Sequence, residues 1–177
     1  MINIILILVV LAILGLLVVA AMQPSEFSIN RTAIITAPAS AIFPHVNNLR
    51  QWDAWSPWAK LDPNAKNAFE GPEEGVGAKL SWAGNNKVGV GSMTITESRP
   101  FDVIRFRLDF LKPMTATNVA EFSFKPDGDQ TAVTWLMTGN NNFMAKVMGL
   151  MMNCDKMVGG QFEQGLATLK TVVEAGD

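Results

Sequence analysis

The feature that most restricts the fold of this chain is a series of six short runs between Asn67 and Gly139. Glycine, asparagine and proline separate the runs, and the connecting segments AGNNK and PDGDQ are rich in residues that tolerate tight turns. The runs read NAFEG, GAKLSWAG, VGVGSMTITESRP, DVIRFRLDF, MTATNVAEFSFKP and TAVTWLMTG. We interpret them as six successive strands of one antiparallel meander.

One further strand and one helix are predicted before the meander. FSINRTAII alternates apolar and polar residues with a period near two, which is typical of a strand. Pro38 then stands near a helix start, and apolar residues recur at helical spacing, which predicts about three turns ending near the segment WDAWSPWAKLDP. Ser56 precedes Pro57 and is therefore disfavoured in a helix, so we expect the helix to end near Trp55.

Helical spacing returns after Asn142 and continues to the C-terminal region. Gly159 and Gly160 weaken the pattern, so we expect a short helix or bent turn before a longer terminal helix. These glycines and Gly165 also favour close approach of the helix to the sheet or a ligand, although a kink explains the first pair equally well. The predicted fold class is α+β, with a curved antiparallel sheet covered by the terminal helix.

The parity of the strands predicts which side chains face this helix. In DVIRFRLDF, Arg105, Arg107 and Asp109 fall on one face, and Phe106, Leu108 and Phe110 fall on the other. The apolar set is expected to face the helix. The same parity groups Val133 with Trp135 and Met137, Phe122 with Phe124, and Leu80 with Trp82.

Residues Ile2 to Met22 form an uncharged apolar run, which as a helix would extend about 31 Å, close to the ~30 Å hydrocarbon core of a bilayer. We interpret residues 1–23 as a single-pass membrane anchor and residues 24–177 as the globular domain. The alternative is a cleaved signal peptide, because Val19-Ala20-Ala21 offers small residues near a cleavage point. Arg31 is the basic residue nearest the run, and it weakly favours a cytoplasmic domain.

The charge distribution argues against a nucleic-acid partner. The chain carries 14 basic and 16 acidic residues, and neither sign forms a stripe. The single cysteine, Cys154, excludes an internal disulfide and is expected to be a small buried residue. No metal site and no cofactor is predicted, since Cys154 and the single histidine, His45, do not make a ligand cluster.

Several motifs together resemble a known family. WDAWSPWAKLDP, GPEEGVGAKLSWAGN, VGVGSMTITESRP, FLKP and KMVGGQFEQGLATLK are similar to the polyketide cyclase/dehydrase-like branch of the SRPBCC superfamily, which includes START lipid-transfer domains and Bet v 1-type allergens. The resemblance spans approximately Glu26 to Glu174. It implies a helix-grip fold, in which the sheet wraps the C-terminal helix and leaves a hydrophobic cavity. Relatives bind lipids, sterols or polyketides and only some are enzymes, so the resemblance alone does not assign a reaction.

Two groups of residues have both a structural and a functional interpretation. Trp52, Trp55 and Trp58 suit a hydrophobic gate or cavity wall, but the burial preference of large aromatics favours a plug that seals the core. A group of methionines suits either an adaptable apolar surface or irregular core filling. The methionines are Met144, Met148, Met151, Met152 and Met157.

The ionisable residues give little support to catalysis. The chain has no tyrosine, and His45 has no partner at a suggestive spacing, so we expect a surface or satisfied core histidine. The carboxylates form no recognisable pair in the sequence. A carboxylate such as Asp53 or Glu97 inside the cavity with a raised pKa would favour an enzyme.

Three functions remain open. The leading hypothesis is a membrane-anchored module that binds a lipid or other hydrophobic small molecule. The alternatives are a cyclase or dehydratase, and an interaction or stress-response protein whose cavity is filled. The residues predicted to line the ligand site are Trp55, Trp58, Trp82, Phe106, Phe110, Trp135 and Phe162.

Overall fold

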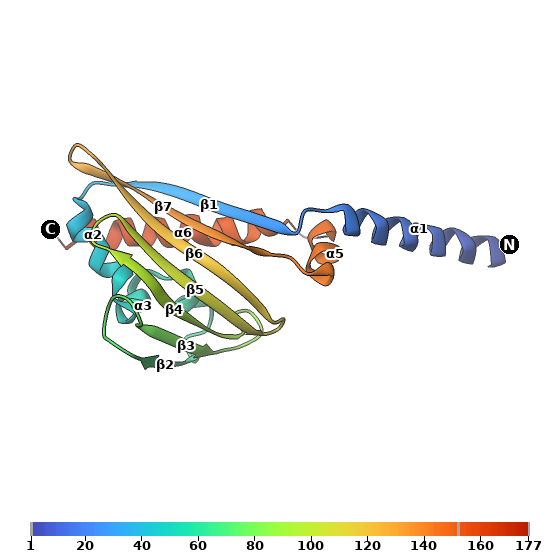
Figure 1. Cartoon of the computed structure of the whole chain (residues 1–177), viewed down its shortest axis with the longest axis horizontal. Helices are drawn as coiled ribbons and strands as arrows, with labels where there is room; N and C mark the ends of the chain where they lie inside the picture. The colour runs from blue at the N-terminus through green and yellow to red at the C-terminus, as the bar shows by residue number, and fades with distance from the viewer. Residues whose placement is uncertain (1, 152, 177) are drawn as a thin grey trace.

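The computed structural model describes residues 2–151 and 153–176, and a lone helix projects from one end of a sheet-and-helix domain (Figure 1). This helix, α1, comprises Ile2–Met22 and leads through three residues into the first strand, β1. The remaining strands are β2 to β7, α2 to α4 lie between β1 and β2, and α5 and α6 follow β7. Their bounds are β1 Glu26–Ile35, α2 Ala39–Asn47, α3 Trp52–Trp55, α4 Pro57–Leu61, β2 Lys66–Glu70, β3 Lys79–Ala83, β4 Val90–Arg99, β5 Val103–Lys112, β6 Ala116–Asp127, β7 Gln130–Asn140, α5 Phe143–Met151 and α6 Cys154–Glu174.

The seven strands form one antiparallel sheet in the order β1-β7-β6-β5-β4-β3-β2. The six predicted meander strands are therefore confirmed, and β1 joins the sheet beside β7, with Arg31 opposite Trp135. Glu26 pairs with Asn140, so β1 begins and β7 ends at the end of the sheet nearest α1. We call this the α1 end; β5 also finishes there, and β6 begins there.

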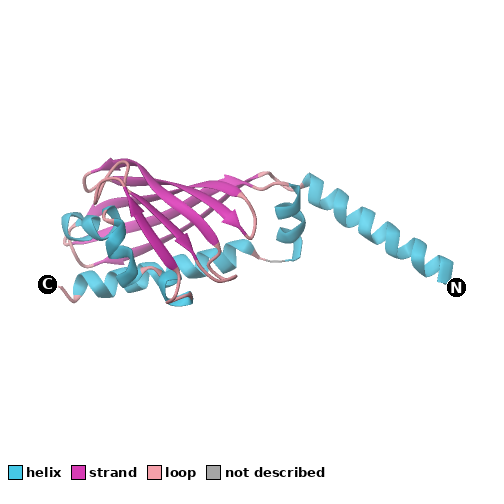
Figure 2. Cartoon of the chain, turned by 90° about the horizontal axis from the view of Figure 1, so that it is seen from below, coloured by secondary structure: helices cyan, strands magenta, loops and turns pink. Residues whose placement is uncertain are grey.

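The terminal helix α6 lies along the concave side of the sheet, as predicted (Figure 2). Except for the adjacent Gly165 and Leu166, its buried residues recur every three or four positions, which gives one continuous stripe toward the sheet and toward α3 and α4. Asn153 caps the first turn, with its side-chain oxygen accepting from the backbone N–H of Lys156. The buried residues are Gly159, Phe162, Gly165, Leu166, Leu169 and Val173.

The predicted strand parities agree with the burial. Phe106 is fully buried, Leu108 and Phe110 are half-buried, and Arg105 and Arg107 are exposed. The other predicted groups also point to the concave side: Leu80 with Trp82 on β3, Phe122 with Phe124 on β6, and Val133 with Trp135 and Met137 on β7. The ring of Phe106 packs on Trp52 of α3, so α3 shares with α6 the task of covering this face.

Three local expectations were wrong. The helix expected before the tryptophans ends at Asn47, because the Asn48 side chain accepts from the backbone N–H of Arg50 and starts a separate short turn. The expected short helix before the longer terminal helix is present as α5, but the break lies before Cys154 and not at the glycines, and α6 is continuous through Gly159 and Gly160. Gly159 leaves room for the guanidinium of Arg31, which packs directly against the helix. Cys154 is exposed rather than buried, since it occupies the first turn of α6.

The five methionines considered above as either surface or core filling lie in α5, in α6 and between them. Met144, Met148 and Met157 are exposed, so these three form surface rather than core. Met152 lies outside the described residues, as do Met1 and Asp177 at the ends of the two predicted segments.

Candidate ligand-binding site

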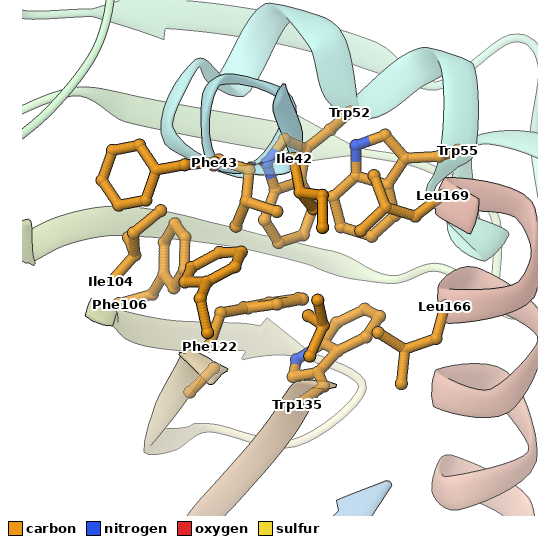
Figure 3. Close-up of a cluster of buried hydrophobic side chains, with 14 of the residues drawn as sticks. Ile42, Phe43, Trp52, Trp55, Ile104, Phe106, Phe122, Trp135, Leu166 and Leu169 are labelled. Carbon is orange, nitrogen blue, oxygen red and sulfur yellow. Dashed lines mark hydrogen bonds between the residues drawn. The ribbon is translucent and has the colours of Figure 1, made fainter. Parts of the chain in front are cut away.

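A cluster of aromatic rings fills the centre of the concave face (Figure 3). Trp135 of β7 stacks on Phe162 of α6, with 4.2 Å between ring centroids and 8° between the ring planes. The ring centroid of Phe122, on the neighbouring strand β6, lies 4.7 Å from that of Trp135. Each such pair adds about 0.5–1.5 kcal/mol beyond the burial of its apolar surface, so the cluster holds α6 firmly on the sheet.

Two of the three tryptophans in WDAWSPW belong to this core. Trp52 and Trp55 are almost fully buried, and their indole N–H groups donate to the backbone oxygens of Val46 and His45, both at 3.0 Å. Helix α3 ends at Trp55, and Pro57 begins α4. The interpretation as a core plug therefore describes Trp52 and Trp55.

Trp58 has a different environment. It is half-buried, and its ring meets the edges of Trp135 and Phe162 at centroid distances of 5.5 Å and 6.2 Å. Gly165 of α6 makes room for this arrangement, because a Cβ there would lie 2.9 Å from the Trp135 ring and 3.0 Å from Pro57. Trp58 thus joins the α4 segment to the partly open side of the aromatic cluster.

Trp82 and Phe110 form a separate pair at the α1 end of the sheet. Both are half-buried, with 6.0 Å between ring centroids, and the Trp82 indole donates to the backbone oxygen of Val88 at 3.3 Å. Gly91 lies between them on β4, and a Cβ there would collide with the Trp82 ring. Leu108 and Phe27, also half-buried, lie on the same face.

The seven predicted lining residues therefore lie in two kinds of environment. Trp55, Phe106, Trp135 and Phe162 lie in the buried centre, whereas Trp58, Trp82 and Phe110 keep part of their ring surface accessible. The concave face changes from closed aromatic packing at its centre to partly exposed apolar surface toward the α1 end.

Three polar atoms are buried without a hydrogen-bond partner among the described residues: Asn118 Oδ1, Trp135 Nε1 and Gln161 Oε1. Asn118 pairs with Leu108 on one side and Gly139 on the other, within the half of the face nearest α1. An unpaired buried polar group costs about 1–3 kcal/mol. Our sequence reasoning missed Asn118, although its parity matches that of the buried Ala120 and Phe122.

An ion-pair group fixes the N-terminal half of α6. The Arg31 guanidinium contacts Glu163 at 2.6 Å and Asp155 at 3.0 Å. The hydrogen bond from Arg31 lowers the pKa of the Asp155 carboxyl. The group closes over Gly159, so it holds α6 against β1.

The groups considered for catalysis lie away from the apolar face. Asp53 is exposed, and Glu97 forms ion pairs with Arg99 and Arg105. Burial lowers the pKa of His45, which favours the neutral form of its imidazole. Across residues 2–151 and 153–176, no three His, Cys, Asp or Glu side chains are grouped as metal ligands.

Two hollows open on the surface of the domain, away from the aromatic cluster. One, of about 250 Å³, lies beside Arg50 and Phe69, where the guanidinium carbon is 4.5 Å from the ring centroid. The other, of about 300 Å³, lies between the β3–β4 turn and Lys112. Their linings share no residue with the seven predicted positions.

Residues 26–174 match the family described as polyketide cyclase / dehydrase and lipid transport. The chain belongs to this family. No curated protein matches the sequence significantly. Membership of the polyketide cyclase/dehydrase and lipid transport family agrees with the resemblance in the sequence motifs, and it covers all elements from β1 to α6.

Solved structures show the same fold at low identity. Protein CV1439 from Chromobacterium violaceum is 13% identical, with a TM-score of 0.61 over 83% of this chain and 96% of that one. The Aha1 dimer from Colwellia psychrerythraea is 18% identical, with a TM-score of 0.56 over 85% and 98% of the two chains. Ara h 8.0201 is 9% identical, with a TM-score of 0.55 over 85% and 99%. These likenesses place the polyketide cyclase/dehydrase family member in the Bet v 1-like fold.

Proposed function

We propose that this protein is a membrane-anchored module that binds a lipid or another hydrophobic small molecule on the concave face of its sheet. The observation that carries the proposal is the partly exposed apolar surface of Trp82 and Phe110 at the α1 end of the concave face, with the half-buried Trp58 beside the aromatic cluster, in a chain of the polyketide cyclase/dehydrase and lipid transport family. Apolar surface removed from water contributes roughly 25 cal/mol per Å², so an apolar ligand over these rings gains affinity from burial.

The anchor is the second part of the proposal. Residues Asn3–Met22 are long and apolar enough to span a membrane, with a mean hydropathy of 3.5, and almost all of this helix is exposed. Lipid would cover the apolar surface that the domain leaves uncovered. A signal sequence passes the same test of length and hydropathy, and the weak cytoplasmic preference from Arg31 stays a prediction.

The ligand would also have a polar group. Asn118 Oδ1 and Gln161 Oε1 are acceptors, and Trp135 Nε1 is a donor. A hydroxyl or amide on an otherwise apolar molecule would satisfy such atoms, and this supports an amphiphilic ligand rather than a pure hydrocarbon. In this proposal the four buried predicted residues form the inner wall, and the three half-buried ones cover the ligand near its entrance.

A matched pair of charge insertions tests the proposal in the full chain. Leu108→Glu places a carboxylate on the concave face, and Val119→Glu places the same group on the outer face of the adjacent strand, where Val119 is 44% exposed. Each protein is purified in mild detergent, and its lipids are identified by native mass spectrometry and extraction. Lipid that binds around α1 should be the same in wild type, Leu108→Glu and Val119→Glu, so only a difference between them reports binding on the concave face.

A discrete molecule that is present with wild type and Val119→Glu but lost with Leu108→Glu supports the module. Thermal melting checks that each variant is folded, and the uncharged Leu108→Asn replaces Leu108→Glu if the latter fails. Identical lipid sets in all variants would contradict the proposal.

One observation favours a second candidate, an interaction protein with a filled interior. Trp52, Trp55 and Phe122 are packed ring against ring, and both indole N–H groups already have backbone partners. A core closed in this way needs no ligand. The lipid comparison separates the two candidates, because only the binding module loses a molecule in Leu108→Glu.

A further inference from the structure

Helix α5 lies beside the C-terminal end of α1, outside the layers of the domain (Figures 1 and 2). Its position is fixed from both sides. The backbone N–H of Asn141 donates to the Ser25 oxygen at 2.7 Å, which extends the pairing of β1 with β7, and the Asn142 side chain caps α5 by accepting from the Ala145 N–H at 2.9 Å. Ala20, in the last two turns of α1, is fully buried. A small residue at such a position allows two helices to approach closely.

The outward side chains of α5 are apolar. Phe143 is 49% exposed, Met144 59% and Met148 40%. Met144 and Met148 are four residues apart and share one face of the helix, whereas Lys146 falls on the opposite face by helical spacing. Met157, in the first turns of α6, adds a further side chain that is 53% exposed. Flexible thioethers at these positions are unusual for a surface that meets only water.

The exposed apolar side chains of α5 form a patch, and the contact of α5 with α1 sets the depth of this patch relative to a bilayer. A helix of 21 residues extends about 31 Å, so its ends lie near the two edges of a ~30 Å hydrocarbon core. The C-terminal end of α1 therefore reaches one membrane–water boundary, and α5 packs at that level. The bilayer that α1 crosses is the surface directly available to Met144 and Met148.

We propose that α5 is an interfacial helix that inserts Phe143, Met144 and Met148 into the boundary between lipid headgroups and acyl chains. This inference rests on the proposed anchoring through α1. It adds a second membrane contact, which turns the α1 end of the concave face toward the bilayer. A hydrophobic ligand would then pass between the membrane and Trp82 or Phe110 without crossing open water. The occupant of the patch is lipid, and a protein partner would be a different outcome of the test.

Site-directed spin labels measure the depth of α5 in the full chain. Cys154→Ser removes the single cysteine, and four separate cysteines are then introduced at Leu11, Met144, Met148 and Lys125. Leu11 lies in the middle of α1, and Lys125 is exposed near the end of β6 that is opposite the α1 end. Each labelled protein is reconstituted in vesicles of phosphatidylcholine and phosphatidylglycerol. Collision rates with oxygen, which concentrates in lipid, and with a nickel chelate, which stays in water, report the depth.

We expect Leu11 to be deep in the bilayer, Met144 and Met148 to be shallow but shielded from nickel by severalfold relative to Lys125, and Lys125 to be in water. A water-like signal at Met144 and Met148 with Leu11 in lipid would overturn the inference and leave the anchor intact. A water-like signal at Leu11 would overturn the anchor and the inference together. Shielding of Met144 and Met148 from oxygen and nickel alike would indicate a protein contact and would also overturn it.

Discussion

The indole of Trp135 lies flat on the phenyl ring of Phe162, with 4.2 Å between centroids, and this contact joins β7 to α6. Because both rings are almost fully buried, Phe162→Ala should lower the free energy of unfolding by about 3–5 kcal/mol. Leu111→Ala is the control, since Leu111 is 60% exposed and its loss should change stability by less than about 0.5 kcal/mol. Urea unfolding of the full chain in detergent, followed by tryptophan fluorescence, measures both. Equal effects would contradict the assignment of Phe162 to the core.

Gly159 and Gly160 are adjacent in α6 but should respond differently to alanine. A Cβ on Gly159 would meet the Arg31 guanidinium, whereas a Cβ on Gly160 would project into open space. Gly160→Ala should therefore stabilise the protein by up to about 1 kcal/mol through helix propensity. Gly159→Ala should be less stable than Gly160→Ala, because Arg31 must move away from Asp155 and Glu163. The difference between the two melting temperatures is the readout, and a higher value for Gly159→Ala would contradict the close packing.

The Arg31–Asp155 contact predicts a loss of stability in acid. Arg31 holds the pKa of Asp155 below its value in the unfolded chain, which is about 3.9. The folded state therefore binds fewer protons, so this contribution is complete above the unfolded pKa and is lost as the pH falls through the folded one. Asp155→Asn should show a shallower fall in the urea midpoint than wild type between pH 5 and pH 3.

Asp129→Asn makes the same change of charge in the exposed β6–β7 turn, away from Arg31. It should retain the acid dependence of wild type. The same slope in Asp155→Asn and Asp129→Asn would show that the Arg31 contact does not contribute.

Asn118 should show opposite effects on stability and binding. Asn118→Leu removes a buried oxygen without a described partner, so the ligand-free protein should gain about 1 kcal/mol of stability. If Asn118 bonds to the polar group of a ligand, the same variant should retain less co-purified ligand in native mass spectrometry. Asn118→Gln, which keeps an uncharged amide oxygen as acceptor, is the matched variant for binding. Unchanged ligand occupancy in Asn118→Leu would remove Asn118 from the site.

The order of the elements could be read from the sequence because the periodicity of each run reports the environment of its side chains. Alternation in DVIRFRLDF placed Phe106 inside and Arg105 outside, and both positions are confirmed. The end of a helix at Trp55, just before Pro57, was also located correctly, although the residues after it form α4 and not a loop. Local patterns of this kind depend on neighbours in the chain.

The details that could not be predicted depend on contacts between distant segments. The need for glycine at position 159 comes from Arg31, about 130 positions earlier, because the guanidinium occupies the space that a Cβ there would fill. The different exposures of Trp52 and Trp58 follow from how α3 and α4 meet β7 and α6, and spacing alone does not encode that. Asn118 was not predicted, although a polar residue at the parity of the buried Ala120 and Phe122 was an available signal.

The three residues between α1 and β1 limit how far the domain can move away from the end of α1. Three residues span at most about 11 Å, and β1 is then paired with β7 along its whole length. With α1 in a bilayer, this short connector would keep the domain close to the membrane surface. A longer connector would form only if the edge strand β1 separated from β7. If α1 is the proposed anchor, the protein would not carry a ligand between distant membranes. It would work as a fixed receiver, serving the leaflet beneath it or handing molecules to partners that come to it.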